Sequence, residues 1–444
     1  MANLNHTFAL QAFNSGINKL SITSNDGVED NLLAANPSLI TYSEHLFRDS
    51  LELQIIFKDT GASFNGKSLV EGLPVVGTED VKIDISDAYG NNLDLDLIVN
   101  KVSTPESNTQ TETVVLSMTS EAFIRNHQET SLVRKRYDGR ISESVKTIIK
   151  ENLKSKVGDN IQETSNNYNF IGNRRKPLYI LRWLSKKSFS SQNGKSGDTA
   201  GFIFFENREG YNFKSLDSMF AESPVEKFIY NDTPEGFSVK SETGKVKISK
   251  FSIDNKVTAE RRLRMGAFNT RMIVFDPFNS EHEIIEESAD EKKGTTAGKK
   301  LPPLNKKFTD VPTRTTYILR DTGTLPTGDV EEQLELSDKE IFEPAKILNQ
   351  ASRRLNQLSL YAVDIEIALD LSYKIGDTVE IEVKSLNGKN DDEENKMVGG
   401  KYLVCSLRHT LLIQNAVTRL GLVRDSIGKV PSNSGLIVDG RGTA

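Results

Sequence analysis

The sequence is poor in cysteine and in long apolar runs, and both shortages limit what the chain can be. It has one cysteine in 444 residues, so it forms no intrachain disulfide and does not depend on an oxidising compartment. Cys405 ends the apolar run 402–405, which predicts a buried, unreactive thiol. Because no window reaches about 18 apolar residues, we expect no transmembrane helix. Residues 1–6 lack the basic start of a signal peptide, so we expect folding in the cytoplasm.

Charge of one sign is not in excess either. The chain carries 56 basic and 62 acidic side chains, a net charge of −6, and 36% of its residues are hydrophobic. These values are typical of a globular protein, and they indicate no general attraction to nucleic acid or to anionic lipid. The length exceeds what one hydrophobic core supports, which predicts about three or four domains.

Groups that support catalysis or metal binding are scarce as well. No two histidines are three or four residues apart, so no zinc site is expected. The segment 193–196 ends like a phosphate-binding loop, but Phe189 stands where that loop needs glycine. The acidic run 391–394 is typical of a hairpin tip rather than of a calcium loop, and Trp183 is expected in a core. The sequence therefore predicts no catalytic, cofactor-binding or metal-binding residue. The histidines are His6, His45, His127, His282 and His409.

Two Asp-Thr-Gly triplets offer the sharpest alternative. They begin at Asp59 and Asp321, and aspartic proteases bring two such turns together so that paired carboxylates share one proton and activate a water. However, Lys58 and Arg320 directly precede the two aspartates, and a cation fits poorly beside a desolvated carboxylate pair. The triplet is also ordinary turn chemistry. We favour two surface turns and keep an aspartic protease that uses Asp59 and Asp321 as the alternative from another class.

Strand patterns dominate the start of the chain, and helical patterns appear further along. Alternating apolar and polar residues over 81–86 and 93–99 place one face in a core and the other in solvent, as antiparallel sheets and small barrels require. The stretch 286–307 has few bulky apolar residues and is rich in Lys, Glu and Gly, which predicts a long solvated loop or linker. Further strands are expected at 51–57, 113–118, 202–205 and 270–275, and helices over 141–153, 177–184 and 346–358.

One part of the N-terminal pattern returns near the C-terminus. Residues 77–85 resemble 376–383, and in both places a charged turn, an apolar strand and a further strand follow. Similarity nearly 300 residues apart predicts two copies of one β-barrel on either side of an inserted middle. Generic antiparallel hairpins produce a similar pattern, so both interpretations stay open. The following strands are 95–102 and 113–118 in the first place, and 402–407 and 416–423 in the second.

Several motifs occur in a fixed order along the chain. The segment 201–217 reads Gly-Phe-Ile-Phe-Phe-Glu-Asn-Arg-Glu-Gly-Tyr-Asn-Phe-Lys-Ser-Leu-Asp. It follows the motifs 169–177 and 180–188, and it precedes 264–277, 351–358, Gly376-Asp377 and 400–404. In order and spacing these motifs resemble the central hub proteins of contractile phage-tail baseplates, a tail tube-to-spike adaptor family related to the hub part of type VI secretion spike proteins. The resemblance covers about residues 40–425.

The resemblance implies an α+β, mostly β fold, with two similar antiparallel β-barrel domains flanking a mixed α/β middle. We expect a first β-barrel (tube) domain and a mixed α/β middle domain, followed by a strand-containing segment with a charged linker. A second β-barrel (tube) domain with a leading helix and a flexible tail complete the chain. In order, these parts are expected over 1–125, 126–240, 241–312, 313–428 and 429–444.

The function implied by the resemblance is structural rather than enzymatic. Such a virion protein is a homotrimeric baseplate hub that links the hexameric tail tube to the trimeric central spike, because two barrels in each of three chains make a pseudo-sixfold ring. The implied partners are the tail tube or tube-initiator protein and the central spike, with the baseplate wedge and tape-measure proteins as further candidates. No cofactor, specific nucleic acid binding or membrane insertion is expected.

The implied location is the tail baseplate of the virion, after assembly in the host cytoplasm. An alternative within the same architecture is the spike-base hub of a type VI secretion or phage-tail-like particle. A spike would continue into a repetitive β-helix, whereas residues 431–444 are short and rich in Gly and Ser. A separate spike chain is therefore expected.

Overall fold

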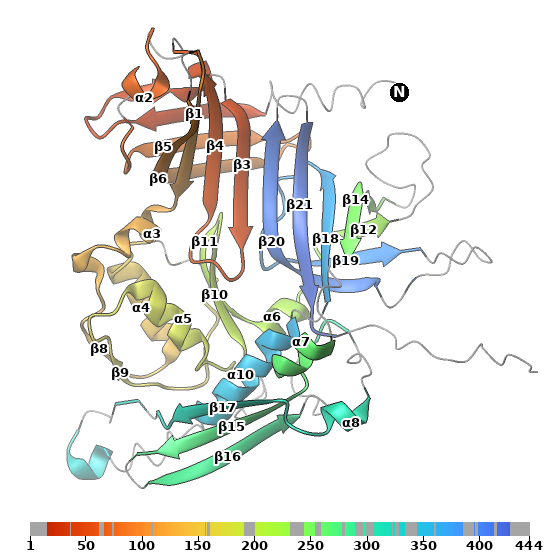
Figure 1. The fold of residues 1–444 in the computed structure, drawn as a ribbon. Coiled ribbons are helices and arrows are strands. Elements are labelled where there is room, and N and C mark those ends of the chain that lie inside the picture. The colour runs from red at the N-terminus through yellow and green to blue at the C-terminus, as the bar shows by residue number, and fades with distance from the viewer. Residues whose placement is uncertain are drawn as a thin grey trace, which may run out of the picture.

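Strands make up most of the ordered structure in the computed structural model of the chain (Figure 1), and the prediction of an α+β, mostly β fold is confirmed. No helix among the described residues is long and apolar enough to cross a membrane. The structure describes residues 16–426 apart from 36, 62–65, 73–74, 108–109, 156, 158–159, 191–199, 231–243, 254–258, 278–279, 289–295, 299–304, 322, 325–327, 334–343, 359–360, 385–394, 396–397 and 413–414. The acidic run 391–394 and the expected tail 429–444 lie outside these residues.

The N-terminal part of the chain folds into one half of a large sheet (Figure 1). Its strands lie in the order β2-β1-β5-β6-β7-β4-β3, and the neighbours pair antiparallel. Alternation explains the core, because β5 and β4 bury every second side chain. The elements are β1 (Ile17–Thr23), β2 (Glu29–Asn31), η1 (Leu32–Ala35), β3 (Pro37–His45), β4 (Glu52–Asp59), α2 (Leu69–Gly72), β5 (Asp80–Ser86), β6 (Asn92–Ser107) and β7 (Glu112–Thr119).

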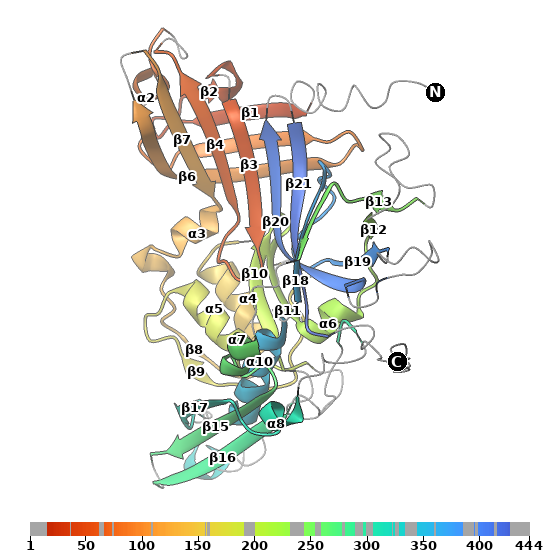
Figure 2. The same cartoon turned by 45° about the vertical axis from the view of Figure 1, so that its right-hand side comes forward.

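The C-terminal part continues the same sheet, because β20 pairs antiparallel with β3 (Figure 2). From β20 the pairings lead through β21 and β18 to β14 on one side, and through β19 and β12 to β13 on the other. The sheet therefore joins the two ends of the sequence, and two separate closed barrels stay a prediction. The strands are β12 (Lys227–Tyr230), β13 (Val246–Lys247), β14 (Lys250–Ile253), β18 (Tyr361–Ala368), β19 (Thr378–Val383), β20 (Gly400–Leu412) and β21 (Asn415–Arg424).

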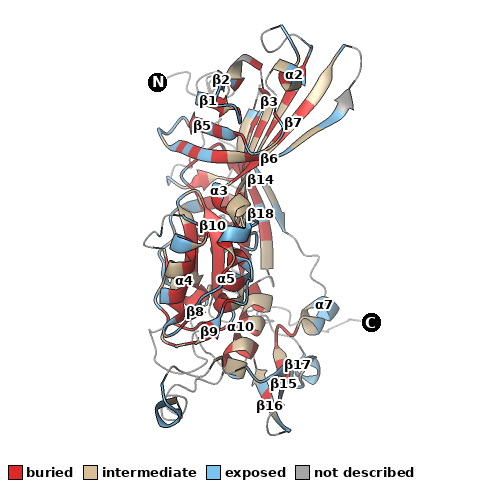
Figure 3. Ribbon diagram, turned by 90° about the vertical axis from the view of Figure 1, so that its left-hand side faces the viewer, coloured by how far each residue is buried: buried red, intermediate tan, exposed pale blue. Residues whose placement is uncertain are grey.

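A helical layer with its own core lies beside the C-terminal half of the sheet (Figures 1 and 3). Its apolar side chains come from α4, α5 and the β10-β11 hairpin, and they include Ile148, Leu181 and Phe213. The helices expected over 141–153 and 177–184 are confirmed. The elements are α3 (Glu121–Arg125), η2 (Glu129–Ser131), β8 (Arg136–Tyr137), α4 (Ile141–Glu151), β9 (Phe170–Ile171), α5 (Pro177–Ser185), β10 (Phe202–Asn207), β11 (Gly210–Ser215) and α6 (Leu216–Ala221).

A small three-stranded sheet lies at the opposite end of the molecule from β1 and β5 (Figure 1). The helix α10 packs on one face of it, through Ala345 and Leu348 against Met272 and Val274. The expected loop over 286–307 is partly wrong, because β16 runs to Ser288 in register with β15. The elements are α7 (Ala259–Arg264), β15 (Asn269–Asp276), β16 (Glu281–Ser288), α8 (Lys306–Thr309), β17 (Arg314–Leu319) and α10 (Pro344–Leu358).

Candidate functional site

Asp59 of the first Asp-Thr-Gly triplet holds a turn at the end of β4. Its side chain is buried. One carboxylate oxygen accepts a hydrogen bond from Gly61 N at 2.8 Å, and the other accepts from Leu69 N. The hydrogen bond to Gly61, two residues on, is the usual device of a turn, and the bond to Leu69 spans ten residues. Asp59 therefore fastens the segment between β4 and α2.

Asp321 of the second triplet is held by a different part of the chain. Its carboxylate accepts hydrogen bonds from Tyr168 Oη at 2.7 Å, Lys187 Nζ at 2.7 Å and Gly323 N at 3.0 Å. Burial alone raises the pKa of Asp321, but Lys187 and the hydrogen bonds outweigh burial and hold this pKa below its ordinary value. Asp321 borders a hollow of about 500 Å³ between α5, β17 and α10.

The two aspartates do not form the carboxylate pair of an aspartic protease. Asp59 ends β4 in the large sheet, and Asp321 follows β17 in the small sheet at the far end of the molecule (Figure 1). Each carboxylate has its own donors, and Asp321 is kept ionised by Lys187. Two carboxylates share a proton only at about hydrogen-bonding distance, so the structure gives the protease alternative no support.

Metal-binding and thiol chemistry also lack a site in the described part of the chain. Within it, no three His, Cys, Asp or Glu side chains gather closely enough to hold a metal ion. Cys405 is buried, as expected, and burial raises the pKa of its thiol to about 12. Burial lowers the pKa of His409 to about 3, and its ring nitrogen lies 2.9 Å from Thr418 Oγ1. These two side chains are part of the core.

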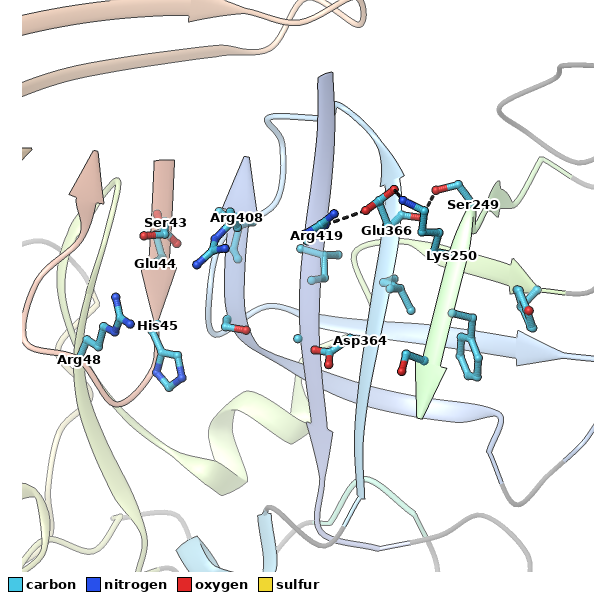
Figure 4. A pocket seen from close by; sticks show the side chains of 18 residues that line it. Ser43, Glu44, His45, Arg48, Ser249, Lys250, Asp364, Glu366, Arg408 and Arg419 are labelled. Atoms are coloured by element: carbon cyan, nitrogen blue, oxygen red, sulfur yellow. Dashed lines mark hydrogen bonds and ion pairs between the residues drawn. The ribbon is translucent and has the colours of Figure 1, made fainter. Parts of the chain in front are cut away.

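A hollow of about 800 Å³ lies where β3, β20, β21, β18 and β14 run side by side (Figure 4). Its lining includes the small residues Ser43, Ser406 and Gly421. A Cβ atom on Gly421 would displace Ser406 Oγ from its present position. The rest of the lining is rich in charge.

The charged side chains around this hollow are of both signs. Glu366 accepts from Lys250 Nζ at 2.7 Å and from Arg419 Nε at 2.7 Å (Figure 4). Burial raises the pKa of Glu366, but the two cations outweigh burial and hold it below its ordinary value. Arg408 lies directly opposite Arg419 in register. Like charges directly opposite on two strands are destabilising.

A second group of polar residues joins three parts of the chain around Glu44. This side chain is buried at the end of β3. It accepts hydrogen bonds from Tyr42 Oη at 2.6 Å, from Arg208 N at 2.7 Å and from Ile375 N at 3.0 Å. The donors come from the N-terminal half, the β10-β11 turn and the segment before β19. Burial raises the pKa of Glu44.

Glu206 extends this junction towards the helical layer. Its Oε2 accepts from Ser120 Oγ at 2.8 Å and from Leu51 N at 3.3 Å, and burial raises the pKa of Glu206 to about 7. The sequence interpretation missed both acids. A signal was present, because Glu44 lies in the buried phase of β3 with Ile40 and Tyr42. Both carboxyls accept backbone N–H groups: Glu44 joins the two halves of the sheet, and Glu206 joins β10 to the N-terminal half. This is a structural role.

The strand order of the N-terminal half recurs in the C-terminal half. Strands β4 to β7 pair in the spatial order β4-β7-β6-β5, and β18 to β21 pair in the order β18-β21-β20-β19. Every one of these pairings is antiparallel. The chain visits the four strands in the same sequence both times. The segments 77–85 and 376–383, which resemble each other in sequence, contain β5 and β19.

An irregularity in the ladder lies at the same point of both four-strand sets. The β6-β7 pairing shifts between Val99 and Lys101, and the β20-β21 pairing shifts between Val404 and Ser406. In both sets the shift begins one residue after the last residue that pairs with the preceding strand, which is Ile98 for β5 and Leu403 for β19. A β-bulge is a specific feature that persists within related structures. Val99 and Val404 are therefore counterparts.

The residue that enters the first strand of the repeated hairpin also matches. Thr78 N donates to Val99 O at 2.7 Å, and Gly376 N donates to Val404 O at 3.0 Å. Both residues have left-handed backbone conformations, with φ of 74° at Thr78 and 90° at Gly376. Glycine adopts this conformation without strain, whereas a β-branched residue does not. The same backbone path is thus kept at some cost in the N-terminal copy.

A carboxylate fastens this entry in both copies. Glu79 Oε1 accepts from Val76 N at 2.7 Å, three residues back, and Asp377 Oδ2 accepts from Lys374 N at 3.1 Å, also three residues back. Both acids follow directly after the left-handed residue, and both are buried. Generic hairpins have no reason to share a bulge, a left-handed entry and a buried acid at matching positions. These matches favour duplication over coincidence.

Comparison with solved structures identifies similar folds. A 43 kDa tail protein of prophage MuSo2 from Shewanella oneidensis aligns with a TM-score of 0.53 and 11% identity, over 92% of this chain and 99% of that one. A tail protein from Neisseria meningitidis MC58 aligns with a TM-score of 0.51 and 10% identity, over 92% of this chain and 97% of that one. No family model and no curated protein matches the sequence. The chain has the fold of these tail proteins, which the sequence resemblance predicted.

Proposed function

We propose that the chain is a structural virion protein, the homotrimeric hub of a contractile-tail baseplate, which links a hexameric tail tube to a trimeric central spike. The observation that carries this proposal is the matching pair of four-strand sets in a chain with the fold of phage tail proteins. Three chains with two equivalent sets each offer six equivalent surfaces, whereas the chain as a whole repeats three times. Such an object joins sixfold and threefold partners.

The strand pairings support a tube-like arrangement for each half. In the C-terminal half, the pairings run β14-β18-β21-β20-β19-β12-β13, and β13 and β14 are separated by two residues of chain. Ile248 N, between them, donates to Ile229 O of β12 at 3.0 Å. This circuit favours a small barrel in this half. The pairing of β12 and β14 with β19 and β18 also favours assigning 227–253 to the second tube domain rather than to the middle or the linker.

The remaining parts of the proposal concern partners and place. The tail tube or tube-initiator protein and the central spike are the proposed partners, and the wedge and tape-measure proteins are further candidates. The proposed place is the tail baseplate of the virion. The protein acts by shape and binding, because Asp59 and Asp321 are apart and structural.

The proposal is tested by the mass and symmetry of the purified chain, alone and mixed with the tail tube and spike proteins encoded beside it. Light scattering should give three times the chain mass of 49.5 kDa. Averaged negative-stain images should show a ring with six peripheral densities, of which alternate ones are alike. A chain that stays monomeric under all these conditions, or a ring without six parts, would overturn the proposal.

A further inference from the structure

One sheet junction inside the chain resembles an interface between subunits. The first residues of β20 pair with β19, and beyond the bulge β20 pairs with β3 instead. This antiparallel junction runs from Ser406 opposite His45 to Leu412 opposite Leu39, with Thr410 opposite Thr41. It joins the C-terminal four-strand set to the N-terminal one, so it shows how two neighbouring sets fit together.

The strand that β20 meets has its own counterpart, which is β14. Strand β3 pairs antiparallel with β4 on the edge away from β7, and β14 pairs antiparallel with β18 on the edge away from β21. Thr41 faces Gln54, and Ser252 faces Asp364. Gln54 and Asp364 hold matching positions in their sets. Each faces a residue of the next strand, β7 or β21, and that residue in turn faces the first residue after the bulge, in β6 or β20. Ser252 is therefore the counterpart of Thr41.

The counterpart of β20 is β6, and its register beyond the bulge can also be matched. Thr410 faces Val417, and Glu106 faces Thr113. In β21, Val417 lies four residues before the residue that faces the first position of β20 after the bulge. In β7, Thr113 likewise lies four residues before the residue that faces the first position of β6 after the bulge. Glu106 is therefore the counterpart of Thr410. The one difference is an additional irregularity in β6 between Ser103 and Glu106.

Strands β6 and β14 correspond to β20 and β3, but the edges that β20 and β3 pair with each other have no partner strand in β6 and β14 among the described residues. Strand β5 ends opposite Ile98, so within the described residues 101–107 pair with β7 alone. Residues 250–253 pair with β18 alone in the same described set. An open edge offers a row of backbone donors and acceptors to another strand. Among the described residues these two edges are therefore open, and the β20-β3 junction of the same chain shows that edges of this kind fit each other.

We propose that residues 101–107 of β6 pair antiparallel with β14 of the partner subunit, in the register of the β20-β3 junction. Glu106 then faces Ser252 of the partner subunit, as Thr410 faces Thr41 within the chain. The interface joins different edges of two copies, so repeating it generates a ring where the rotation closes. In the proposed trimer three copies with two sets each bring six sets into that ring. This partner surface deepens the trimer proposed above and rests on it.

Pro105 is compatible with this pairing. Proline lacks an N–H and is tolerated in edge strands chiefly at bulges, and Pro105 lies inside the irregularity between Ser103 and Glu106. The N–H groups of the residues around it remain available. The pairing would also cover both open edges, which removes a template for uncontrolled aggregation.

Disulfide formation between introduced cysteines tests the register. The variants Glu106→Cys and Ser252→Cys, mixed and oxidised, should give a covalent dimer of the two chains. The double variant E106C/S252C should shift from monomer to covalent dimer and trimer on a non-reducing gel. Directly opposite residues lie about 4.5–5.5 Å apart, within the range a disulfide spans. Cys405 is buried and should remain reduced.

Two matched variants make the result decisive. In T41C/T410C the same geometry lies within one chain, so an intrachain disulfide should form whether or not subunits assemble. In E106C/K250C the register is shifted by two residues, and diagonal neighbours about 7–8 Å apart exceed what a disulfide spans. A trimer by light scattering with no 106–252 disulfide, while T41C/T410C oxidises, would overturn this interface and leave the proposed hub standing. A monomer throughout would overturn the hub itself.

Discussion

At the scale of single residues, the most informative side chain is a buried acid. Glu206 is 6% exposed, and burial raises its pKa from 4.5 to about 7. Between pH 4.5 and about 7 the folded chain therefore keeps a proton that the unfolded chain has lost. The bound proton therefore adds to the free energy of unfolding. This contribution is fully present below pH 4.5 and is lost as the pH rises through about 7.

We expect Glu206→Gln to flatten the pH dependence of stability in this window. The free energy of unfolding of the wild type should fall with rising pH by up to about 1.4 kcal/mol per pH unit more than that of E206Q. Urea unfolding of both proteins at pH 5, 6, 7 and 8 measures the difference. Asp377 stays in both proteins, so its contribution cancels. Equal slopes would contradict the buried, protonated state of Glu206, and Glu121→Gln, at an exposed site, is the matched control.

Several residue-scale predictions from the sequence were confirmed because local pattern decides them. Cys405 lies in an apolar run and is buried. Trp183 is partly buried and packs on the core of the helical layer, against Tyr168 and Phe170 at ring distances of 5.3 and 5.5 Å. The junction around Glu44 and Glu206 was not predictable in the same way, because its donors and acceptors lie up to 331 residues apart in the sequence. Only the fold brings those segments together.

At the scale of elements, glycine conformation distinguishes the two copies of the repeat. Gly376 has φ of 90°, and a Cβ atom there would lie 2.9 Å from Phe205 Cζ. Gly90 has a similar φ of 87° but has nothing within 4 Å of that position. Substitution of either glycine would therefore strain the backbone, but only at Gly376 would the new side chain collide with a neighbour. Thr78, the counterpart of Gly376, already accepts the left-handed conformation.

We expect Gly376→Ala to destabilise the fold by about 2–4 kcal/mol, as left-handed strain of roughly 1 kcal/mol adds to overpacking of about 1–3 kcal/mol. Gly90→Ala carries the strain without the clash and should cost about 1 kcal/mol. Chemical denaturation of both variants measures the difference, which isolates the contact with Phe205. Equal losses would mean that Phe205 moves aside freely.

Long, strongly periodic elements were predictable, and short ones were not. The helices 141–153, 177–184 and 346–358 and the strands near 81–86 and 93–99 follow apolar periods that packing preserves. The short strands β12, β13 and β14 have two to four residues, too few to show a period. They exist because β18 and β19 offer edges to them. The last residues of strand β16, 286–288, were read as linker, since Glu286, Glu287 and Ser288 are all polar.

At the scale of the whole molecule, backbone-directed side chains hold the two sheet halves and the helical layer in one arrangement. Arg208 N donates to Glu44 at 2.7 Å, and its guanidinium donates to Leu371 O and, at 2.9 Å, to Ser372 O. One residue of the β10-β11 turn thus bonds both halves of the large sheet.

We expect Arg208→Ala to weaken this junction and to make unfolding less cooperative. Two charged hydrogen bonds to carbonyls are lost, at about 1.5–3 kcal/mol each where well formed, while the N–H to Glu44 remains. Differential scanning calorimetry should show a lower Tm and a van't Hoff enthalpy below the calorimetric one, because the helical layer and the C-terminal half then unfold separately. Arg134→Ala removes hydrogen bonds of 2.9 and 3.0 Å to the exposed Glu129, and it should leave a single transition. If R208A also unfolds in one transition at the wild-type Tm, other contacts couple the halves, and the junction around Glu44 is not what makes the molecule a single rigid body.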